Sequence, residues 1–265
     1  MYRLQNNPHR DESLVKMFIS QTKTTAAIAN DCLRHNDWNI KAAVVDWHEN
    51  PNKYVSKVMQ ANINKMYVAY KDSGPGAVIT DDNVLRLLDD LKLRADSMEV
   101  LVLAWMCRAR TQCCFTKQEF VNGMARLEVE NIVALRNKLG IVTRDIFNTD
   151  KFKDFYIFAF KYAKEEDSKY LDINSAIVYW HIILKKEFQL LNGWCQYIKE
   201  RDVKCINLDT WKCVLDFVKE IHPTLDNYSM DDAWPTLIDE FVCWYREHFL
   251  SPKSAQNGKQ DPSLN

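Results

Sequence analysis

The chain has 265 residues, 47% of them hydrophobic and 27% charged, with 35 Lys and Arg against 36 Asp and Glu. This composition is typical of a folded globular protein and not of a disordered one. The balance of charge excludes the strongly basic surface on which nucleic-acid binding relies, so we expect no nucleic-acid partner. Six Gly and seven Pro are too few for the turns of a sandwich or barrel, and an all-α fold is predicted.

The cellular compartment can be predicted from apolar runs and cysteines. The longest apolar run, residues 100–107, is far shorter than the roughly 20 residues that cross a bilayer. The N-terminal residues, Met-Tyr-Arg-Leu-Gln-Asn-Asn-Pro, lack the apolar core of a signal peptide, so we expect neither secretion nor a membrane partner. The eight cysteines show no paired CxxC spacing, which predicts reduced thiols in the cytosol or nucleus.

The N-terminal part has the pattern of a small separate bundle. Apolar side chains recur at helical spacing within residues 14–18, 26–33 and 40–47, with polar residues between them. Pro51 then ends the third helix, because the residue before a proline avoids the helical conformation. We therefore predict a three-helix bundle over residues 8–50, close to the lower size limit for a core that folds alone.

Further helical stripes predict that the larger remainder of the chain, up to the polar tail, is also helical. Within it, Thr116 and Glu119 have the spacing of a capping box. The aromatic-rich segment 152–162 predicts a helix that is buried on all sides, either in the core or as the lining of a groove for a partner helix or chain terminus. The polar residues 251–265 predict a disordered tail.

Two twelve-residue loops, 72–83 and 108–119, lie between helical segments like the loops of a paired EF-hand. Calcium requires oxygen ligands at loop positions 1, 3, 5 and 12 and a glycine at position 6. The second loop has arginines at positions 1 and 3, and the first has glycines at positions 3 and 5. We predict a scaffold that binds no metal, in which Ile79 pairs with Phe115 through a short β-bridge.

No enzyme class is indicated. The chain contains no nucleophile elbow, P-loop, zinc-protease motif or dinucleotide fingerprint. Cys113 and Cys114 could suggest a thiol enzyme, but the sequence pairs none of the six histidines with a cysteine, and packing is the commoner role of such residues. The sequence therefore predicts a protein with no catalytic residues and no cofactor.

Acidic residues gather around Ala233 in the C-terminal region. They form either a solvated face or a docking patch in which a small residue at the centre lets a basic partner approach. Their spacing alone does not decide between these interpretations. The acidic residues are Asp226, Asp231, Asp232, Asp239 and Glu240.

Five short stretches carry a family resemblance: 110–113, 115–120, 152–156, 209–211 and 233–239. Together they resemble the defective-in-cullin-neddylation family. Residues 8–50 are similar to its ubiquitin-associated (UBA) domain, and residues 57–250 to its potentiating-neddylation (PONY) domain with degenerate EF-hand-like units. The resemblance implies a non-catalytic, scaffold-type ligase cofactor in the nucleus and cytoplasm. Such a protein binds a cullin and the neddylation conjugating enzyme and promotes transfer of the ubiquitin-like modifier to the cullin, which activates cullin-RING ubiquitin ligases.

The resemblance also implies two partner sites. The family's cullin-binding patch, which binds the cullin C-terminal domain, falls on Asp209, Ala233 and Asp239, although Asp209 at a predicted helix start is also a candidate N-cap. The family's hydrophobic pocket accepts the N-acetylated methionine of the conjugating enzyme, since a free ammonium would lose hydration without a paired charge. By position it is lined by Val84, Val100, Leu103, Ala104, Cys107, Phe115, Tyr162, Tyr179 and Ile182.

The sequence leaves two alternatives open, one for ubiquitin binding by the N-terminal bundle and one for the complex that the whole chain joins. Residues 20–24 stand where ubiquitin-binding UBA domains usually carry a Met-Gly-Phe type loop, so the sequence favours weak ubiquitin binding or none. The alternative for the whole chain is a calcium-independent EF-hand-like adaptor in an unrelated complex. A pull-down with a cullin C-terminal domain separates the two hypotheses.

Overall fold

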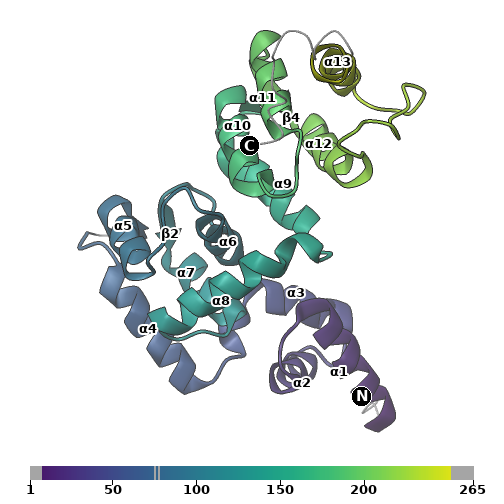
Figure 1. Cartoon of the computed structure of the whole chain (residues 1–265). Coiled ribbons are helices and arrows are strands. Elements are labelled where there is room, and N and C mark those ends of the chain that lie inside the picture. Colours follow the sequence, from purple (N-terminus) through teal and green to yellow (C-terminus); the bar gives the residue numbers. More distant parts are fainter. Residues whose placement is uncertain (1–7, 75, 77, 252–265) are drawn as a thin grey trace. The chain divides into compact units, whose positions relative to one another are not determined.

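The computed structural model describes residues 8–74, 76 and 78–251. These residues form thirteen α-helices and two antiparallel two-stranded sheets (Figure 1). The predicted all-α fold is confirmed, because every strand has only three residues. Within the described part of the chain, no helix is long and apolar enough to cross a membrane. Residues 252–265 of the predicted tail lie outside the described residues.

Contacts within the chain define two compact units. The first extends to Ala95 and includes Glu99–Asp145, and the second consists of Asp96–Met98 and the chain from Ile146 onward. The domain limits that the sequence suggested follow the family resemblance, and they stay a prediction.

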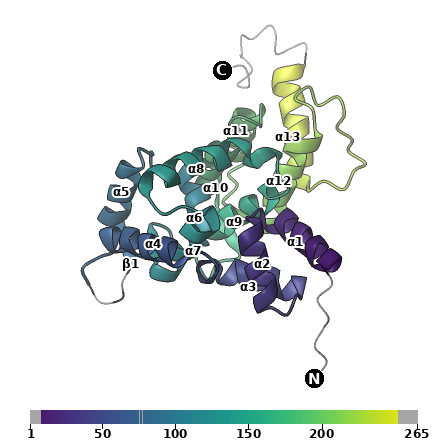
Figure 2. The same cartoon turned by 90° about the horizontal axis from the view of Figure 1, so that it is seen from below.

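The first unit begins with the predicted three-helix bundle, formed by α1 (Pro8–Thr22), α2 (Ala26–His35) and α3 (Ile40–Glu49). The three helices lie together in both views of the chain (Figure 2). Thr25 and Asn39 cap α2 and α3, each accepting a hydrogen bond from a backbone N–H three residues later. The buried core of the bundle consists of Phe18, Ile28, Ala29, Cys32, Leu33, Ala43 and Trp47.

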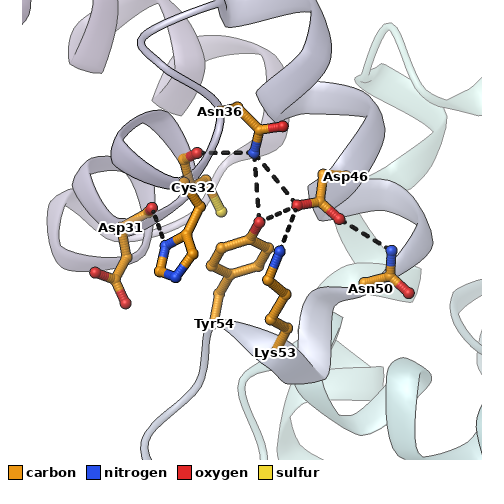
Figure 3. A network of polar contacts seen from close by, with 8 residues as sticks. Asp31, Cys32, Asn36, Asp46, Asn50, Lys53 and Tyr54 are labelled. Atoms are coloured by element: carbon orange, nitrogen blue, oxygen red, sulfur yellow. Dashed lines mark hydrogen bonds and ion pairs between the residues drawn. The ribbon is translucent and has the colours of Figure 1, made fainter.

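A polar network fastens the segment after the bundle to α3 (Figure 3). The carboxylate of Asp46 accepts hydrogen bonds from Asn50 Nδ2 at 2.9 Å, Lys53 Nζ at 3.0 Å and Asn36 Nδ2 at 3.3 Å, and from the hydroxyl of Tyr54. Burial alone would raise the pKa of Asp46, but the donated hydrogen bonds outweigh it and hold the pKa well below its usual value. The ionised carboxylate therefore contributes to the stability of the bundle.

Asp46→Asn is expected to lower the melting temperature at pH 7, because the amide cannot replace a carboxylate that accepts four hydrogen bonds. A depressed folded-state pKa gives stability above the unfolded pKa of about 3.9, and that stability is lost progressively below it. The difference between variant and parent should therefore narrow between pH 7 and pH 3. Thermal unfolding across this range measures it, with the exposed Asp37→Asn as the matched control. A difference that does not change with pH would refute the role of this carboxylate.

The bundle is followed by a pair of helix–loop–strand–helix units. The strands pair antiparallel with Ile79 opposite Phe115, so the predicted bridge is confirmed, as is the capping box of Thr116 and Glu119. After these units come α8 (Ile132–Asp145) and the second compact unit. The elements of the pair are α4 (Lys57–Tyr70), β1 (Val78–Thr80), α5 (Asp81–Asp90), α6 (Met98–Cys107), β2 (Cys114–Thr116) and α7 (Lys117–Leu127).

Helix α7 joins the bundle to this pair through partly buried polar contacts. Asn122 Nδ2 donates to the backbone oxygen of Glu49 at 2.8 Å. The guanidinium of Arg126 donates to the backbone oxygens of His48 at 2.8 Å and Met106 at 2.7 Å. These carbonyls belong to the last turns of α3 and α6, where helix carbonyls lack partners within the helix. Burial lowers the pKa of Arg126 to about 10, so the side chain is still charged at neutral pH.

The second unit repeats the helix–loop–strand–helix arrangement, for which the sequence pattern gave no prediction there. Its strands also pair antiparallel, with Leu171 opposite Ile206. Helix α13 (Thr236–Tyr245) and a short π-helical turn at Arg246–Leu250 follow. The repeated elements are α9 (Phe152–Ala163), β3 (Tyr170–Asp172), α10 (Ile173–Leu184), α11 (Leu191–Glu200), β4 (Cys205–Asn207) and α12 (Leu208–Glu220).

An aromatic stack forms the centre of the second unit. The ring of Trp211 lies 4.5 Å from that of Tyr156 and 5.3 Å from that of Trp180, and all three are fully buried. The indole N–H of Trp180 donates to the Tyr156 hydroxyl, and that of Trp211 donates to the Tyr156 backbone oxygen, both at 2.9 Å. The core interpretation of segment 152–162 is therefore confirmed for most of its aromatic residues, but the helix is not buried on all sides, since its charged residues are exposed. Of the aromatic residues, only Phe158 and Tyr162 are half-buried.

Candidate functional site

Asp209 lies exposed in the first turn of α12. The side chain of Asn207 caps this helix, because its oxygen accepts a hydrogen bond from the backbone N–H of Thr210 at 2.8 Å. The interpretation of Asp209 as an N-cap is therefore wrong, because the helix begins at Leu208, two residues earlier than an N-cap at Asp209 requires. Its carboxylate adds a favourable negative charge at the helix N-terminus but is not needed for capping.

Ala233 and Asp239 are linked through two aromatic side chains. Ala233 is exposed in the segment between α12 and α13, next to Trp234. The ring of Trp234 stacks on that of Tyr228 with a centroid distance of 6.0 Å. The hydroxyl of Tyr228 donates to Asp239 Oδ1 at 2.6 Å. Asp239, in the first turn of α13, is thus half-buried and hydrogen-bonded, and not simply solvated.

The structure brings all three predicted cullin-binding residues into the second unit. Asp209 is on α12 and Asp239 on α13, and these helices meet where the rings of Phe217 and Phe241 lie 6.1 Å apart. Asp209 precedes Phe217 by eight residues, so it lies about 12 Å further along the axis of α12 at a rise of about 1.5 Å per residue.

The other acidic residues of this region differ in how they are held. Glu240 accepts a hydrogen bond from the hydroxyl of Tyr197 at 3.0 Å, and Asp226 accepts one from the hydroxyl of Thr224 at 2.8 Å. Hydrogen bonds from Thr224 and then from His222 hold the pKa of Asp226 below its usual value. Asp231 and Asp232 precede Ala233 in the chain. Within the described residues, no Lys or Arg forms an ion pair with these two carboxylates or with Asp209 or Asp239. These carboxylates can therefore attract a basic partner.

The nine residues of the predicted acetyl-methionine pocket divide between the two units. In the first unit, Val84 and Phe115 are buried, and α6 contributes the half-buried Val100 and the fully buried Leu103, Ala104 and Cys107. In the second unit, Tyr179 is buried and Tyr162 and Ile182 are half-buried. A single pocket formed by both groups stays a prediction. Two grooves of the first unit, one beside α2 and one beside the start of α8, contain none of the nine residues.

One close contact shapes this part of α6. A Cβ atom added at Gly123 of α7 would lie 2.3 Å from the sulfur of Cys107. The two helices therefore approach so closely at this point that only glycine fits on α7. The position of Cys107 is thus fixed by packing, and the sequence had indicated neither the contact nor its glycine.

The sequence is similar to those of known proteins. Residues 134–244 match the cullin binding family, and this stretch includes Asp209, Ala233 and Asp239. "Defective in cullin neddylation protein 1" from Caenorhabditis elegans is 29% identical over 291 residues, with 98% of each chain covered. "DCN1-like protein 5" from Homo sapiens is 32% identical over 177 residues, which cover 67% of this chain and 75% of the relative. "DCN1-like protein 4" from Danio rerio is 34% identical over 182 residues, which cover 69% of this chain and 65% of the relative.

The chain belongs to the defective in cullin neddylation family. The resemblance that the short stretches indicated is therefore confirmed. The match to the cullin binding family ends within α13, so it includes most of the second unit.

In both EF-hand-like loops, the carboxylate at a calcium-ligand position is hydrogen-bonded within the loop itself. Asp72, at position 1 of the first loop, accepts hydrogen bonds from Thr80 Oγ1 and Asn83 Nδ2, both at 2.6 Å, and these lower its pKa. Glu119, at position 12 of the second loop, accepts from the backbone N–H of Thr116 at 2.8 Å and of Arg110 at 3.1 Å. Protein donors thus occupy the oxygens that would bind calcium. No group of three or more metal-ligating side chains occurs among the described residues.

Calcium is expected to leave the protein unchanged. At millimolar concentration it would have to displace the hydrogen bonds of Asp72 and Glu119, and the remaining loop positions supply too few oxygens to compensate. The melting temperature with calcium and with a chelator measures this directly. A stabilisation of several degrees by calcium, absent with magnesium at equal ionic strength, would show that a loop binds the ion.

Cys114 lies in an environment that disfavours the thiolate. All eight cysteines are free thiols; Cys113 is exposed and Cys114 half-buried. Burial raises the pKa of Cys114, and nearby carboxylates, first among them Glu119, raise it further. A reactive cysteine needs the opposite environment, one that favours the thiolate. Cys113 has φ +54° at loop position 6, so it supplies the turn for which a calcium-binding loop uses glycine.

Proposed function

We propose that this protein is a non-catalytic, scaffold-type ligase cofactor in cullin neddylation. It binds the C-terminal domain of a cullin and the N-acetylated conjugating enzyme, and it promotes transfer of the ubiquitin-like modifier to the cullin. The observation that carries the proposal is the position of Asp209, Ala233 and Asp239 within the stretch that matches the cullin binding family. Two carboxylates without a basic partner in the described chain, together with an exposed alanine in the same unit, suit a basic protein surface.

The proposed contribution to the reaction is proximity. The thioester chemistry belongs to the conjugating enzyme, and the scaffold holds the thioester near the acceptor lysine of the cullin. Two binding sites on one chain raise the effective concentration of each partner for the other, even where each site alone binds weakly. The lack of catalytic motifs in the sequence agrees with this division of work. We place the protein in the nucleus and cytoplasm, where free cysteines remain reduced.

The cullin site is tested by isothermal titration against a cullin C-terminal domain. Saturable binding that weakens with rising salt is expected, since charge attraction contributes to it. The absence of binding at high protein concentration would remove this function. The alternative, a calcium-independent adaptor in an unrelated complex, would then be the better explanation of the fold.

The conjugating-enzyme site is tested with the N-terminal peptide of that enzyme. The acetylated peptide should bind and the peptide with a free ammonium should not, because burying an unpaired charge is costly. Ile182→Arg should weaken peptide binding and leave cullin binding intact, since Ile182 is half-buried and can accept the change without unfolding. Ala104 is unsuitable for this test, because it is only 1% exposed. Equal affinity for both peptides would contradict the pocket.

A further inference from the structure

The segment 221–235, between α12 and α13, has no helix or strand, yet its own polar groups hold it in place. Asn227 accepts a hydrogen bond from the backbone N–H of His222 at 2.8 Å and donates one to the backbone oxygen of Glu220 at 2.7 Å. The guanidinium of Arg246 donates to the backbone oxygen of Leu225 at 2.6 Å. Irregular segments of this length within a compact unit are uncommon, and they usually serve a function.

Tyr228 is the side chain on which this segment converges. It is 6% exposed, and its ring lies 5.9 Å from Phe217 of α12 and 6.0 Å from Trp234. The guanidinium of Arg246 lies over the ring at 5.9 Å. The hydroxyl donates to Asp239 Oδ1 at 2.6 Å. Tyr228 therefore contacts α12, α13 and the neighbour of Ala233 at the same time.

The hydroxyl acts as a permanent donor. Burial, and then the hydrogen bond to Asp239, raise the pKa of Tyr228 well above its usual value, so the hydroxyl keeps its proton at neutral pH. One carboxylate oxygen of Asp239 is thereby fixed. Among the described residues, the second oxygen has no hydrogen-bond donor, so it can accept from a basic group outside this chain.

We propose that Tyr228 is the positioning residue of the cullin-binding surface. It orients the carboxylate of Asp239 through its hydroxyl, and it holds Ala233 in place through the stacked ring of Trp234. The inference rests on the proposed function, because it assumes that Asp239 and Ala233 contact the cullin. A surface that is ordered before binding loses less entropy on binding, and this is the advantage that Tyr228 supplies.

Tyr228→Phe tests the orienting hydroxyl, because the ring contacts remain and only the hydrogen bond is lost. Affinity for a cullin C-terminal domain should fall by about threefold to tenfold, the cost of ordering one carboxylate side chain on binding. Binding of the acetylated peptide should not change. Tyr170→Phe is the matched control, since Tyr170 is 54% exposed on β3 and its hydroxyl has no hydrogen bond within the described residues.

A double-mutant cycle with Asp239→Asn separates positioning from a general loss of structure. If Tyr228 acts through the charge of Asp239, Tyr228→Phe should weaken cullin binding much less in the Asp239→Asn background than in the parent. Equal effects in the two backgrounds, or unchanged affinity in a folded Tyr228→Phe protein, would overturn the inference while leaving the proposed function in place. A parent protein that does not bind the cullin domain would overturn both. Should Tyr228→Phe lose its near-ultraviolet circular dichroism, Trp234→Phe tests the stacked arrangement instead, with the same expected fall in affinity.

Discussion

Replacing Asp209 with lysine is expected to abolish measurable binding of a cullin C-terminal domain while the protein stays folded. Asp209 is exposed and does not cap α12, so the fold should lose only about 0.3–1 kcal/mol through the helix dipole. In the interface, loss of one partner from a buried charge pair costs about 2–5 kcal/mol, which is roughly 30-fold to several-thousand-fold in affinity. Isothermal titration measures the effect.

Glu220→Lys is the matched control for this reversal. It makes the same change of charge on the same helix, at an exposed site at the far end of α12. It should leave cullin affinity within about threefold of the parent, because only long-range attraction changes. An Asp209→Lys protein that is folded and binds as tightly as Glu220→Lys would remove Asp209 from the cullin-binding surface.

Arg126→Met should produce the largest loss of stability in the first unit. The change removes two hydrogen bonds that the charged guanidinium donates, and the backbone oxygens of His48 and Met106 lose this donor. Hydrogen bonds to charged groups contribute about 1.5–3 kcal/mol each, and relief from burying the charge offsets part of this, so we expect a loss of about 2–4 kcal/mol. Chemical denaturation gives the free energy of unfolding.

Hydrogen exchange measured by mass spectrometry localises this effect. Exchange should accelerate in α3, α6 and α7 and stay unchanged in α10–α12 of the second unit. Arg144→Met is the control, because Arg144 is exposed and its one ion pair among the described residues is with the adjacent Asp145, a surface pair that contributes little to stability. If the two arginine variants are equally stable, the contacts of Arg126 do not hold the bundle to α7.

The β-bridges show what the sequence could and could not predict. Ile79 and Phe115 stand at the same position of two recognisable loops, 36 residues apart, and their pairing was predicted correctly. Leu171 and Ile206 pair in the same way, 35 residues apart, but the loops around them were not recognised. A usable signal was present, since in all four strands the central buried residue is followed by a Thr, Asp or Asn that precedes a helix.

Contacts between distant elements left no such signal. Arg126 and Asn122 have nothing in their local sequence to show that they bind the end of α3. The separate apolar stripes of the bundle gave no sign of these contacts, whereas truncation at residue 50 would remove the acceptor of Asn122 and one of the two acceptors of Arg126. In the same way, nothing in the spacing of Asp239 indicated a hydrogen-bond partner, and only the fold brings it to the hydroxyl of Tyr228.

The candidate cullin-binding surface was predicted by resemblance and not by pattern. The spacing of Asp209, Ala233 and Asp239 left a solvated face and a docking patch equally open. In the structure, Asn207 and not Asp209 caps α12, and Ala233 is exposed. Both features agree with docking, and neither can be deduced from single residue types, because cap positions depend on where the helix actually begins.

The rate of cullin modification at rising concentrations of this protein tests the scaffold function most directly. The assay contains a cullin and the conjugating enzyme that carries the ubiquitin-like modifier as a thioester, and the concentrations of all other components are held constant. The account predicts that the rate first rises and then falls, because an excess of scaffold binds the two partners on separate molecules. Asp209→Lys should abolish the rise. A rate that is the same with and without the protein would contradict the account, and so would a stimulation that Asp209→Lys leaves intact.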